Sequence, residues 1–205
     1  MRYISCYCSV TNTTVAVDGK IYFECDKSPI GNFAKELYKK IDIDYPKFYK
    51  MDMLAKFAFL GVEIFKKHCP SITHYGDDEI ALFFGNKKAS ADSDLQFFES
   101  YQNGGTASPS AFVYTLPSIL MGELAIRNLW YGENLFVILP EFNPTVFENN
   151  CRTFMSGNSK ACLCGWVEVL NDDVEVFLFF VEKKQEGKLN YECTAETIKN
   201  IFNKK

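Results

Sequence analysis

The chain has 205 residues, 47% of them hydrophobic and 23% charged, so it is long and apolar enough to bury a substantial core. A net charge of −4, a pI near 5.3 and the lack of a basic stripe argue against nucleic-acid binding. No segment reaches the ~18 apolar residues that a membrane span needs, and the start is unlike a signal peptide, so we expect a cytoplasmic protein with reduced cysteines.

The first part of the chain is predicted to form strands followed by a short helix. Residues 2–10 and 13–25 are rich in Tyr, Ile, Val, Thr and Cys, which favours short strands. Asp18-Gly19 is a turn signal of the kind found in hairpins. A short helix is expected over residues 32–41.

The next segment, residues 51–68, is predicted to be a long buried helix. Over its middle turns only Lys56 and Glu63 form a polar edge. A helix that is apolar nearly all round is buried, so this one should run through the centre of the fold. A break at residues 44–46 precedes it and Pro70 stops it.

A buried strand and a further helix are expected in the middle of the chain. Residues 79–85 are a short apolar run ending in Gly, a pattern typical of a strand buried on both faces of a parallel sheet. Asp92 or Ser93 is expected to cap a helix that continues to residue 101. Residues 103–109 are predicted to be a loop.

The remainder of the chain is predicted to alternate helices and strands. In order, we expect a helix from Pro117 to about Arg127, a strand over 134–139, a helix over 145–156, strands over 161–170 and 174–182 joined by a turn at 171–173, and a final helix over 194–203. Such alternation indicates an α/β layered fold. No repeat or Pro-rich linker interrupts the pattern, so we expect a single domain over residues 1–205.

Residues 108–168 carry a set of spaced motifs. A Ser-Pro step is followed by an aromatic residue, a Leu-Pro step, a Gly inside a helix, and a Gly turn, and a later strand ends in Gly-x-x-Glu. The residues concerned are Pro109, Phe112, Pro117, Gly122, Gly132, Gly165 and Glu168.

This order of motifs resembles the N-terminal half of a β-ketoacyl synthase, a thiolase-type condensing enzyme. The resemblance is good over 108–168 and loose over 1–185, and Glu133 stands where the family usually has Pro. It implies a thiolase-like half with layered α-β-α architecture and a mixed central sheet.

The resemblance also locates the family's nucleophile. Condensing enzymes carry a Cys on the turn between a strand and a helix, where the helix N-terminus and nearby histidines favour the thiolate. That turn falls here at Pro140-Glu141, which offers no Cys, Ser or Thr, and Cys151 lies about two helical turns further on. The degenerate turn implies that the chain has no catalytic residues of this type.

The histidines of the family are also unmatched. The two catalytic histidines of a full-length enzyme lie in its second half, and the resemblance here is to the first half only. The chain's own His68 and His74 correspond to no catalytic position. No condensing activity is therefore expected.

Glu141 has two interpretations. Chain-length-factor subunits of the family also lose the Cys and carry Gln at this position, so a buried Glu141 would imitate an acyl-thioester. A solvated loop carboxylate is the favoured interpretation, because unpaired Glu is seldom buried.

The cysteines suggest one alternative site. Cys6-x-Cys8 and Cys162-x-Cys164 each place two thiols on one face of a strand, and together they would give four zinc ligands. Zinc ribbons, however, usually use C-x2-C on turns, and free Cys is commonly buried. We interpret these residues as core thiols and predict no metal or cofactor.

Our first functional hypothesis is a non-catalytic subunit that pairs with itself or with a full-length ketosynthase in fatty-acid-like or aryl-polyene-type biosynthesis. Thiolase-type enzymes dimerise through the strand before the nucleophile. An apolar strand cannot stay exposed without inviting association. The interface candidates are Leu135, Phe136, Val137, Ile138 and Leu139.

Two other functions are kept open. In the second hypothesis the remnant pocket binds an acyl chain or an acyl carrier protein without reacting. In the third the chain is an enzyme of different chemistry that uses Cys151 or Cys69, which requires an exposed thiol of low pKa.

Overall fold

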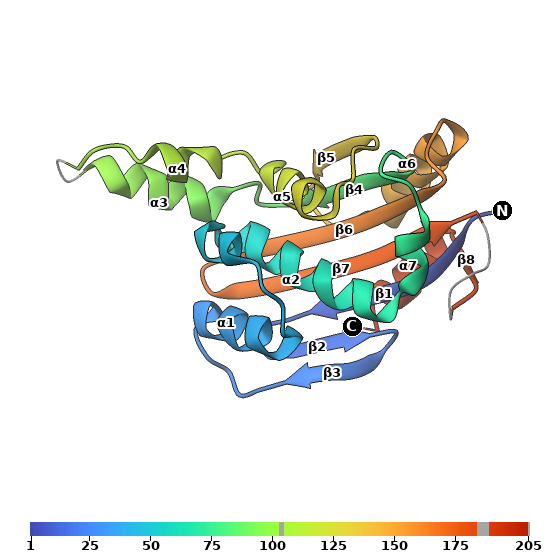
Figure 1. The fold of residues 1–205 in the computed structure, drawn as a ribbon, viewed down its shortest axis with the longest axis horizontal. Helices are drawn as coiled ribbons and strands as arrows, with labels where there is room; N and C mark the ends of the chain where they lie inside the picture. The colour runs from blue at the N-terminus through green and yellow to red at the C-terminus, as the bar shows by residue number, and fades with distance from the viewer. Residues whose placement is uncertain (103–104, 184–188, 205) are drawn as a thin grey trace.

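A computed structural model describes residues 1–102, 105–183 and 189–204 and shows a layered α/β fold around one mixed sheet (Figure 1). The sheet has eight strands in the order β3-β2-β1-β7-β6-β4-β5, and β8 pairs with β1. Its strands are β1 (Tyr3–Val10), β2 (Thr14–Val17), β3 (Lys20–Glu24), β4 (Ile80–Asn86), β5 (Asn134–Ile138), β6 (Ala161–Leu170), β7 (Asp173–Glu182) and β8 (Tyr191–Glu192). Strands β5, β4 and β6 are parallel, and β7 is antiparallel to both β6 and β1.

Helices cover both faces of the sheet, which confirms the predicted α-β-α layering. The helices are α1 (Ile30–Ile41), α2 (Met53–His68), α3 (Ala91–Gln102), α4 (Pro109–Val113), α5 (Ile119–Asn128), α6 (Pro144–Ser156) and α7 (Ala195–Phe202), with 3-10 helices η1 (Pro46–Lys50) and η2 (Pro70–His74). Residues of α1, α2 and α5 belong to one apolar cluster, and residues of α6 and α7 belong to a second. None of the described helices is both long and apolar enough to cross a membrane.

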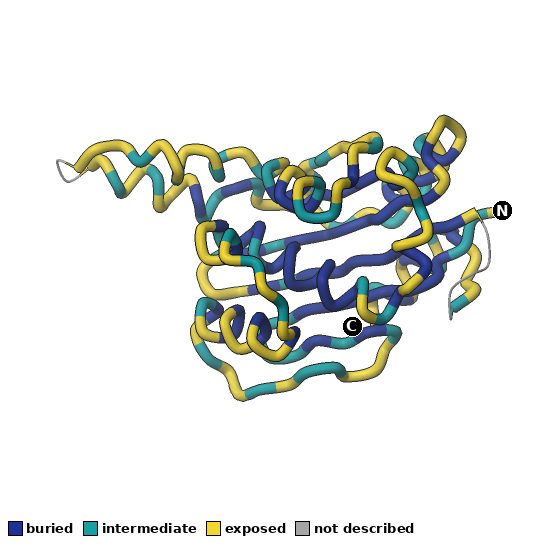
Figure 2. The backbone as a smooth tube through the Cα atoms, in the orientation of Figure 1, coloured by how far each residue is buried: buried dark blue, intermediate teal, exposed yellow. Residues whose placement is uncertain are grey.

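The two clusters are separated by the alternation of side chains along the central strands. Leu163 and Val167 of β6 join the cluster of α2, whereas Cys162, Cys164 and Trp166 join the cluster of α6. Because both faces are covered, β4, β6 and β7 are buried along almost their whole length (Figure 2). The prediction that residues 79–85 form a strand buried on both faces is confirmed.

The predicted central helix is also confirmed, as α2. It begins two residues later than expected because the Asp52 side chain caps it, accepting the backbone N–H of Ala55 at 2.9 Å. The helix lies close on the sheet: a Cβ on Gly61 would come within 2.9 Å of the Leu178 side chain. The absence of a side chain at this position sets the distance between α2 and β7.

Two tight turns match their sequence signals. Asp18 and Gly19 have φ of 51° and 76° between β2 and β3, and Asn171 and Asp172 have φ of 50° and 63° between β6 and β7. Positive φ at both central residues is typical of two-residue hairpin turns. Because the second turn uses only two residues, β7 begins at Asp173, one residue before the predicted start.

The structure corrects several short elements. Helix α3 begins at Ala91, so Asp92 and Ser93 lie in its first turn and do not cap it; Ser93 instead donates to Asp52 at 2.6 Å. The predicted loop 103–109 includes 103 and 104, which lie outside the described residues. Its last residue, Pro109, already begins α4, because Ser108 caps that turn.

We predict opposite effects on stability for two glycines of the motif. A Cβ on Gly165 would overlap the ring of Phe84, which is fully buried, whereas a Cβ on Gly122 in α5 would meet nothing within 4 Å. Gly165→Ala should lower the free energy of unfolding by about 1–3 kcal/mol through overpacking. Gly122→Ala should raise it by roughly 0.5–1 kcal/mol through helix propensity. Urea denaturation of both variants measures the difference, and equal effects would contradict this packing.

Candidate functional site

The candidate site is built around β5, which lies at one end of the sheet. Strand β5 pairs only with β4 among the described strands, so its other side is an open edge. The close parallel approach depends on glycine: a Cβ on Gly85 would lie 2.7 Å from the carbonyl oxygen of Val137. Gly132, just before β5, approaches the carbonyl of Ile80 in the same way.

A bend follows directly after β5. Leu139 donates its backbone N–H to Asn86 at 2.9 Å, which continues the pairing with β4 by one residue. The chain then turns through Pro140-Glu141, and Asn143 caps α6 by accepting the N–H groups of Thr145 and Val146 at 3.1 and 3.3 Å. The structure therefore places Pro140-Glu141 between a strand of the sheet and the N-terminus of a helix.

An open cavity of about 670 Å³ lies at this bend. It is formed at the carboxyl ends of β4 and β6, which is where ligands bind in open sheets with parallel strands. Its charged and aromatic lining residues are Lys87, Lys88, Glu141, Glu168, Asp173, Glu175, Phe142, Trp166 and Phe202. The carboxylates outnumber the lysines, so the cavity is mixed in charge with an excess of negative groups.

The aromatic residue after the bend fixes its position. The Phe142 ring stacks on Phe202 of α7 with centroids 4.1 Å apart and meets the edge of Trp166 at 5.7 Å. Phe142 thus joins the bend to the second apolar cluster. Glu141 remains exposed, which is the environment of a solvated loop carboxylate.

Glu168 supports the opposite wall of the cavity. Its carboxylate accepts the backbone N–H of Lys87, just after the end of β4. Burial raises the pKa of Glu168, the backbone hydrogen bonds from Lys87 and Lys88 partly oppose this, and the Glu175 carboxylate adds to the increase. These contacts hold β4 and β6 together at the cavity.

Neither a thiol nor an imidazole lines the described part of this cavity. Cys151 is fully buried beneath the sheet, and Cys69 is 3% exposed near η2. His68 lies at the end of α2, where its Nδ1 is 2.9 Å from the carbonyl oxygen of Ile64. An exposed nucleophile at Cys151 or Cys69, which the third hypothesis requires, is not found.

Exposed apolar side chains gather on the segment that leads to the bend. Of fifteen large hydrophobic residues exposed in the described chain, eleven lie between residues 95 and 138, and only Met1, Ile21, Tyr49 and Tyr191 lie elsewhere. The eleven are Leu95, Phe98, Tyr101, Phe112, Val113, Leu116, Ile126, Leu129, Tyr131, Leu135 and Ile138.

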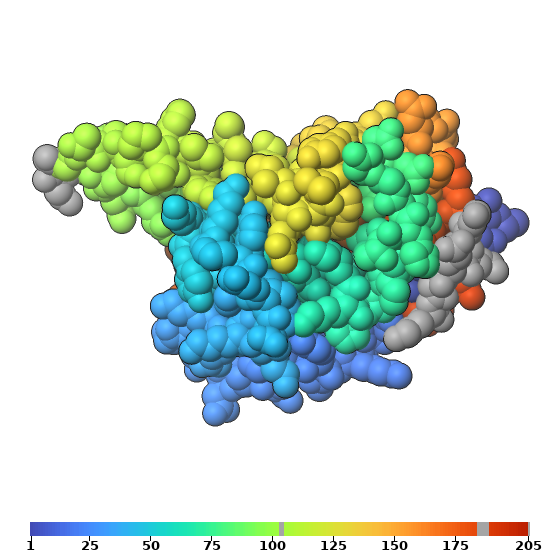
Figure 3. All heavy atoms as spheres, viewed as in Figure 1, coloured from blue at the N-terminus to red at the C-terminus, as the bar shows by residue number. Residues whose placement is uncertain are grey.

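Part of this apolar surface is on a projecting arm. Helices α3 and α4 run side by side away from the body of the molecule (Figures 1 and 3), with the rings of Phe97 and Phe112 5.4 Å apart. Figure 2 shows many exposed residues along the arm, and exposed residues also lie on α5 and β5.

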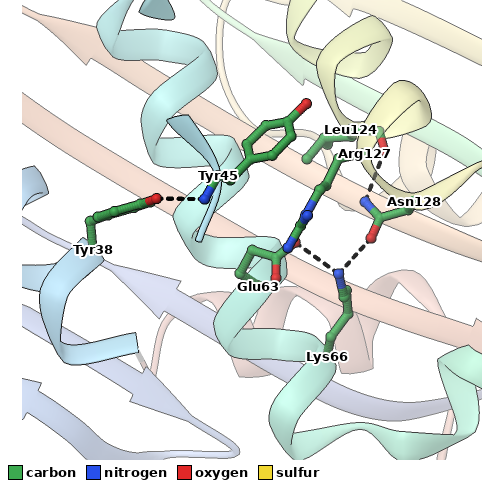
Figure 4. Close-up of polar contacts among 7 residues, drawn as sticks. All are labelled: Tyr38, Tyr45, Glu63, Lys66, Leu124, Arg127 and Asn128. Atoms are coloured by element: carbon green, nitrogen blue, oxygen red, sulfur yellow. Dashed lines mark hydrogen bonds and ion pairs between the residues drawn. The ribbon is translucent and has the colours of Figure 1, made fainter. Parts of the chain in front are cut away.

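An ion-pair cluster anchors α5 to the central helix. Glu63 of α2 is 5% exposed and accepts from Lys66 at 2.8 Å and from Arg127 of α5 at 3.2 Å (Figure 4). Lys66 also donates to Asn128 at 2.6 Å, and the Arg127 guanidinium lies 4.7 Å from the ring centre of Tyr45. This cluster positions the helix that leads into β5.

The motif residues of the sequence occupy four different places, one of them α5, which contains Gly122 and begins two residues after Pro117. Pro109 and Phe112 lie on the arm, and Phe112 is 60% exposed. Gly132 and Gly165 allow close packing beside β4, and Glu168 lies at the cavity. Lys87 and Lys88 at the cavity were not identified from the sequence, because isolated residues at strand ends carry no local signal.

No family model and no curated protein matches the sequence. Solved structures match the fold. The ishigamide ketosynthase/chain length factor aligns with a TM-score of 0.64 and 14% identity over 92% of this chain and 63% of that chain. A ketosynthase (ApeO) in complex with its chain length factor (ApeC) from Xenorhabdus doucetiae aligns at 0.55 and 11% over 89% and 79%. A β-ketoacyl synthase from Burkholderia phymatum STM815 aligns at 0.54 and 11% over 90% and 59%.

These comparisons confirm the predicted fold. The chain has the thiolase-like fold of ketosynthase and chain-length-factor proteins, and it spans about 63% of the first of these chains. At 11–14% identity the similarity is one of fold.

The Glu63 cluster leads to a prediction for stability. Glu63→Gln removes the negative charge between Lys66 and Arg127 and should lower the free energy of unfolding by about 1–3 kcal/mol, because Glu63 is buried. As a control, Glu79→Gln removes an exposed pair with Lys160 and should change stability much less. Equal losses in urea denaturation would show that the cluster has no special role.

Proposed function

We propose that this chain is a non-catalytic, ketosynthase-like subunit that pairs through β5 with a second copy of itself or with a full-length ketosynthase. The observation that carries the proposal is the bend between β5 and α6, where Pro140 and Glu141 stand in place of a nucleophile. The ketosynthase fold and the exposed apolar edge support it. The partner would act in fatty-acid-like or aryl-polyene-type biosynthesis.

The chemistry of the cavity supports a non-catalytic role. Acyl transfer by covalent catalysis needs a nucleophile and a base that activates it, and condensation also needs donors for the developing oxyanion. The described lining residues supply carboxylates, two lysines and aromatic rings. Glu141 is a poor substitute for a thiolate, because it would give an anhydride in place of a thioester.

The open edge of β5 supports the pairing. Leu135 and Ile138 are 39% and 59% exposed, while Phe136, Val137 and Leu139 pack partly against the two apolar clusters. A two-fold axis through this edge would pair β5 with β5 in antiparallel orientation and join two sheets into one. The apolar arm, α5 and Tyr131 would extend the contact on either side of the strand.

The cavity supports a second candidate function, the binding of an acyl chain or an acyl carrier protein without reaction. Phe142, Trp166 and Phe202 offer apolar contact, and Lys87 and Lys88 could face an anionic group at the end of a chain. One of the similar structures is described as an acyl-carrier protein in complex with its ketosynthase. Native mass spectrometry without any acyl species or carrier-protein complex would exclude this function.

We predict that a charge on β5 weakens the pairing. Ile138→Lys places an ammonium group on the open edge, where it should block strand pairing and raise the dimer Kd at least about tenfold, or ~1.4 kcal/mol. Ile21→Lys is the matched control, because Ile21 is 64% exposed on β3 at the other end of the sheet. Analytical ultracentrifugation measures both variants against the wild type, alone and with a purified full-length ketosynthase. A wild-type chain that stays monomeric and ignores the ketosynthase would disprove the pairing.

We also predict that a thiol placed at the bend becomes reactive. In Glu141→Cys the new thiol lies near the N-terminus of α6, whose positive end favours the thiolate, in a cavity that keeps two lysines and three carboxylates. It should be alkylated several-fold faster near neutral pH than the thiol of Glu99→Cys, which is exposed near the C-terminal end of α3. Peptide mapping by mass spectrometry distinguishes alkylation of the two introduced thiols from alkylation of Cys25, the natural thiol that is partly exposed. Equal rates would show that the bend does not favour a thiolate.

A further inference from the structure

Three cysteines meet in the apolar cluster between the sheet and α6, and a fourth belongs to the same cluster. The Cys164 sulfur lies 3.1 Å from that of Cys151 and 3.7 Å from that of Cys162, and the three sulfurs all lie within 4.8 Å of one another. The Cys193 thiol is a neighbour of the Cys151 thiol, but its sulfur lies outside this group of three. Cys151, Cys162 and Cys164 are fully buried, and Cys193 is 3% exposed.

Local structure explains why these residues meet. Cys162 and Cys164 are two residues apart on β6, so both side chains point to the face that α6 covers. Cys151 lies on the buried side of α6, one turn from Phe147 and Met155. Cys193 stands before α7 and is fixed by its backbone N–H, which donates to the Arg2 carbonyl at 2.9 Å.

The set differs from the four-thiol combination considered from the sequence. Cys6 and Cys8 belong to the apolar cluster of α2, whereas Cys162 and Cys164 belong to the cluster of α6. The sheet separates the two pairs, so they cannot share an ion. The alternation of side chains along a strand places the two cysteines of each pair on the same face of the sheet. Which further thiols lie near each pair depends on the tertiary structure.

The distances suit a single tetrahedral ion. A Zn–S bond of about 2.3 Å in tetrahedral geometry places the sulfurs about 3.8 Å apart. The described separations of 3.1 and 3.7 Å and the limit of 4.8 Å bracket this value. Shifts of a few tenths of an ångström would make these three sulfurs equidistant from one centre, and the Cys193 sulfur would have to move closer to complete the tetrahedron.

We propose that Cys151, Cys162, Cys164 and Cys193 bind one thiophilic metal ion of the Zn²⁺ type as a structural site. Binding converts four thiols and Zn²⁺ into a tetrathiolate complex of charge −2 and releases four protons. Four protein ligands leave no position open for water or substrate, which is the arrangement of structural zinc sites. Because the cluster is closed to solvent, the ion enters as the chain folds.

Arg2 offers partial compensation for the charge. Its Nε is buried and has no hydrogen-bond partner among the described residues. The Arg2 carbonyl accepts the backbone N–H of Cys193 at 2.9 Å, which places the two residues side by side. A thiolate at Cys193 would therefore have a cation nearby.

Metal analysis of the full chain tests the proposal directly. Protein purified under reducing conditions should contain about one zinc ion per chain by inductively coupled plasma mass spectrometry. A chelator should remove the ion only when denaturant is present, because the cluster is buried. Refolding of the metal-free chain with Co²⁺ should give the charge-transfer absorption of a cobalt–thiolate site.

Two serine variants locate the site. Cys164→Ser should lose most of the bound metal, whereas Cys8→Ser, equally buried but on the other face of the sheet, should retain it. If Cys164→Ser fails to fold, the metal content and the cobalt spectrum of the wild type still test the proposal. A folded, metal-free wild type whose eight thiols all titrate in denaturant would overturn the proposal. A wild-type mass lower by two hydrogens would also overturn the proposal, because it would indicate a disulfide between Cys151 and Cys164.

Discussion

The close parallel approach of β5 to β4 is the constraint on which the candidate site depends. Gly85 and Gly132 permit it, because a side chain at either position would meet the backbone of the neighbouring strand. This pairing leaves one side of β5 open and places Pro140-Glu141 at the carboxyl ends of β4 and β6. The edge, the bend and the cavity are thus consequences of one packing arrangement.

The two apolar clusters, one on each face of the sheet, hold β4, β5 and the bend in place. The buried helix α2 packs over the sheet, and Glu63 joins it to α5 through Arg127 in an otherwise apolar setting. On the other face, Phe142 ties the bend to α6, α7 and the thiol cluster. The residues proposed to bind a partner or a ligand therefore lie on elements that pack against one of the two apolar clusters. The apolar side chains of the arm and β5 are exposed to solvent.

Long periodic segments could be predicted from the sequence, and tertiary features could not. The apolar residues on nearly all sides of α2 identify a buried helix, and the short apolar run of β4 identifies a buried strand. Few other secondary structures accommodate such patterns. Single turns such as α4 depend on a cap and on neighbours, so their pattern is too short to recognise. The thiol cluster depends on the packing of α6 on β6, which brings Cys151 to Cys164. Similarly, Lys87 and Lys88 reach the cavity only because strand ends converge there.

We propose that the chain uses the fold of ketosynthases without a nucleophile at the bend between β5 and α6. One structure with this fold is described as a ketosynthase in complex with its chain length factor. The most direct measurement is a condensation assay with acyl and malonyl carrier proteins, run with this chain alone. We predict no carbon–carbon bond formation above the rate without protein. Product formed in multiple turnovers by the purified chain would contradict this proposal.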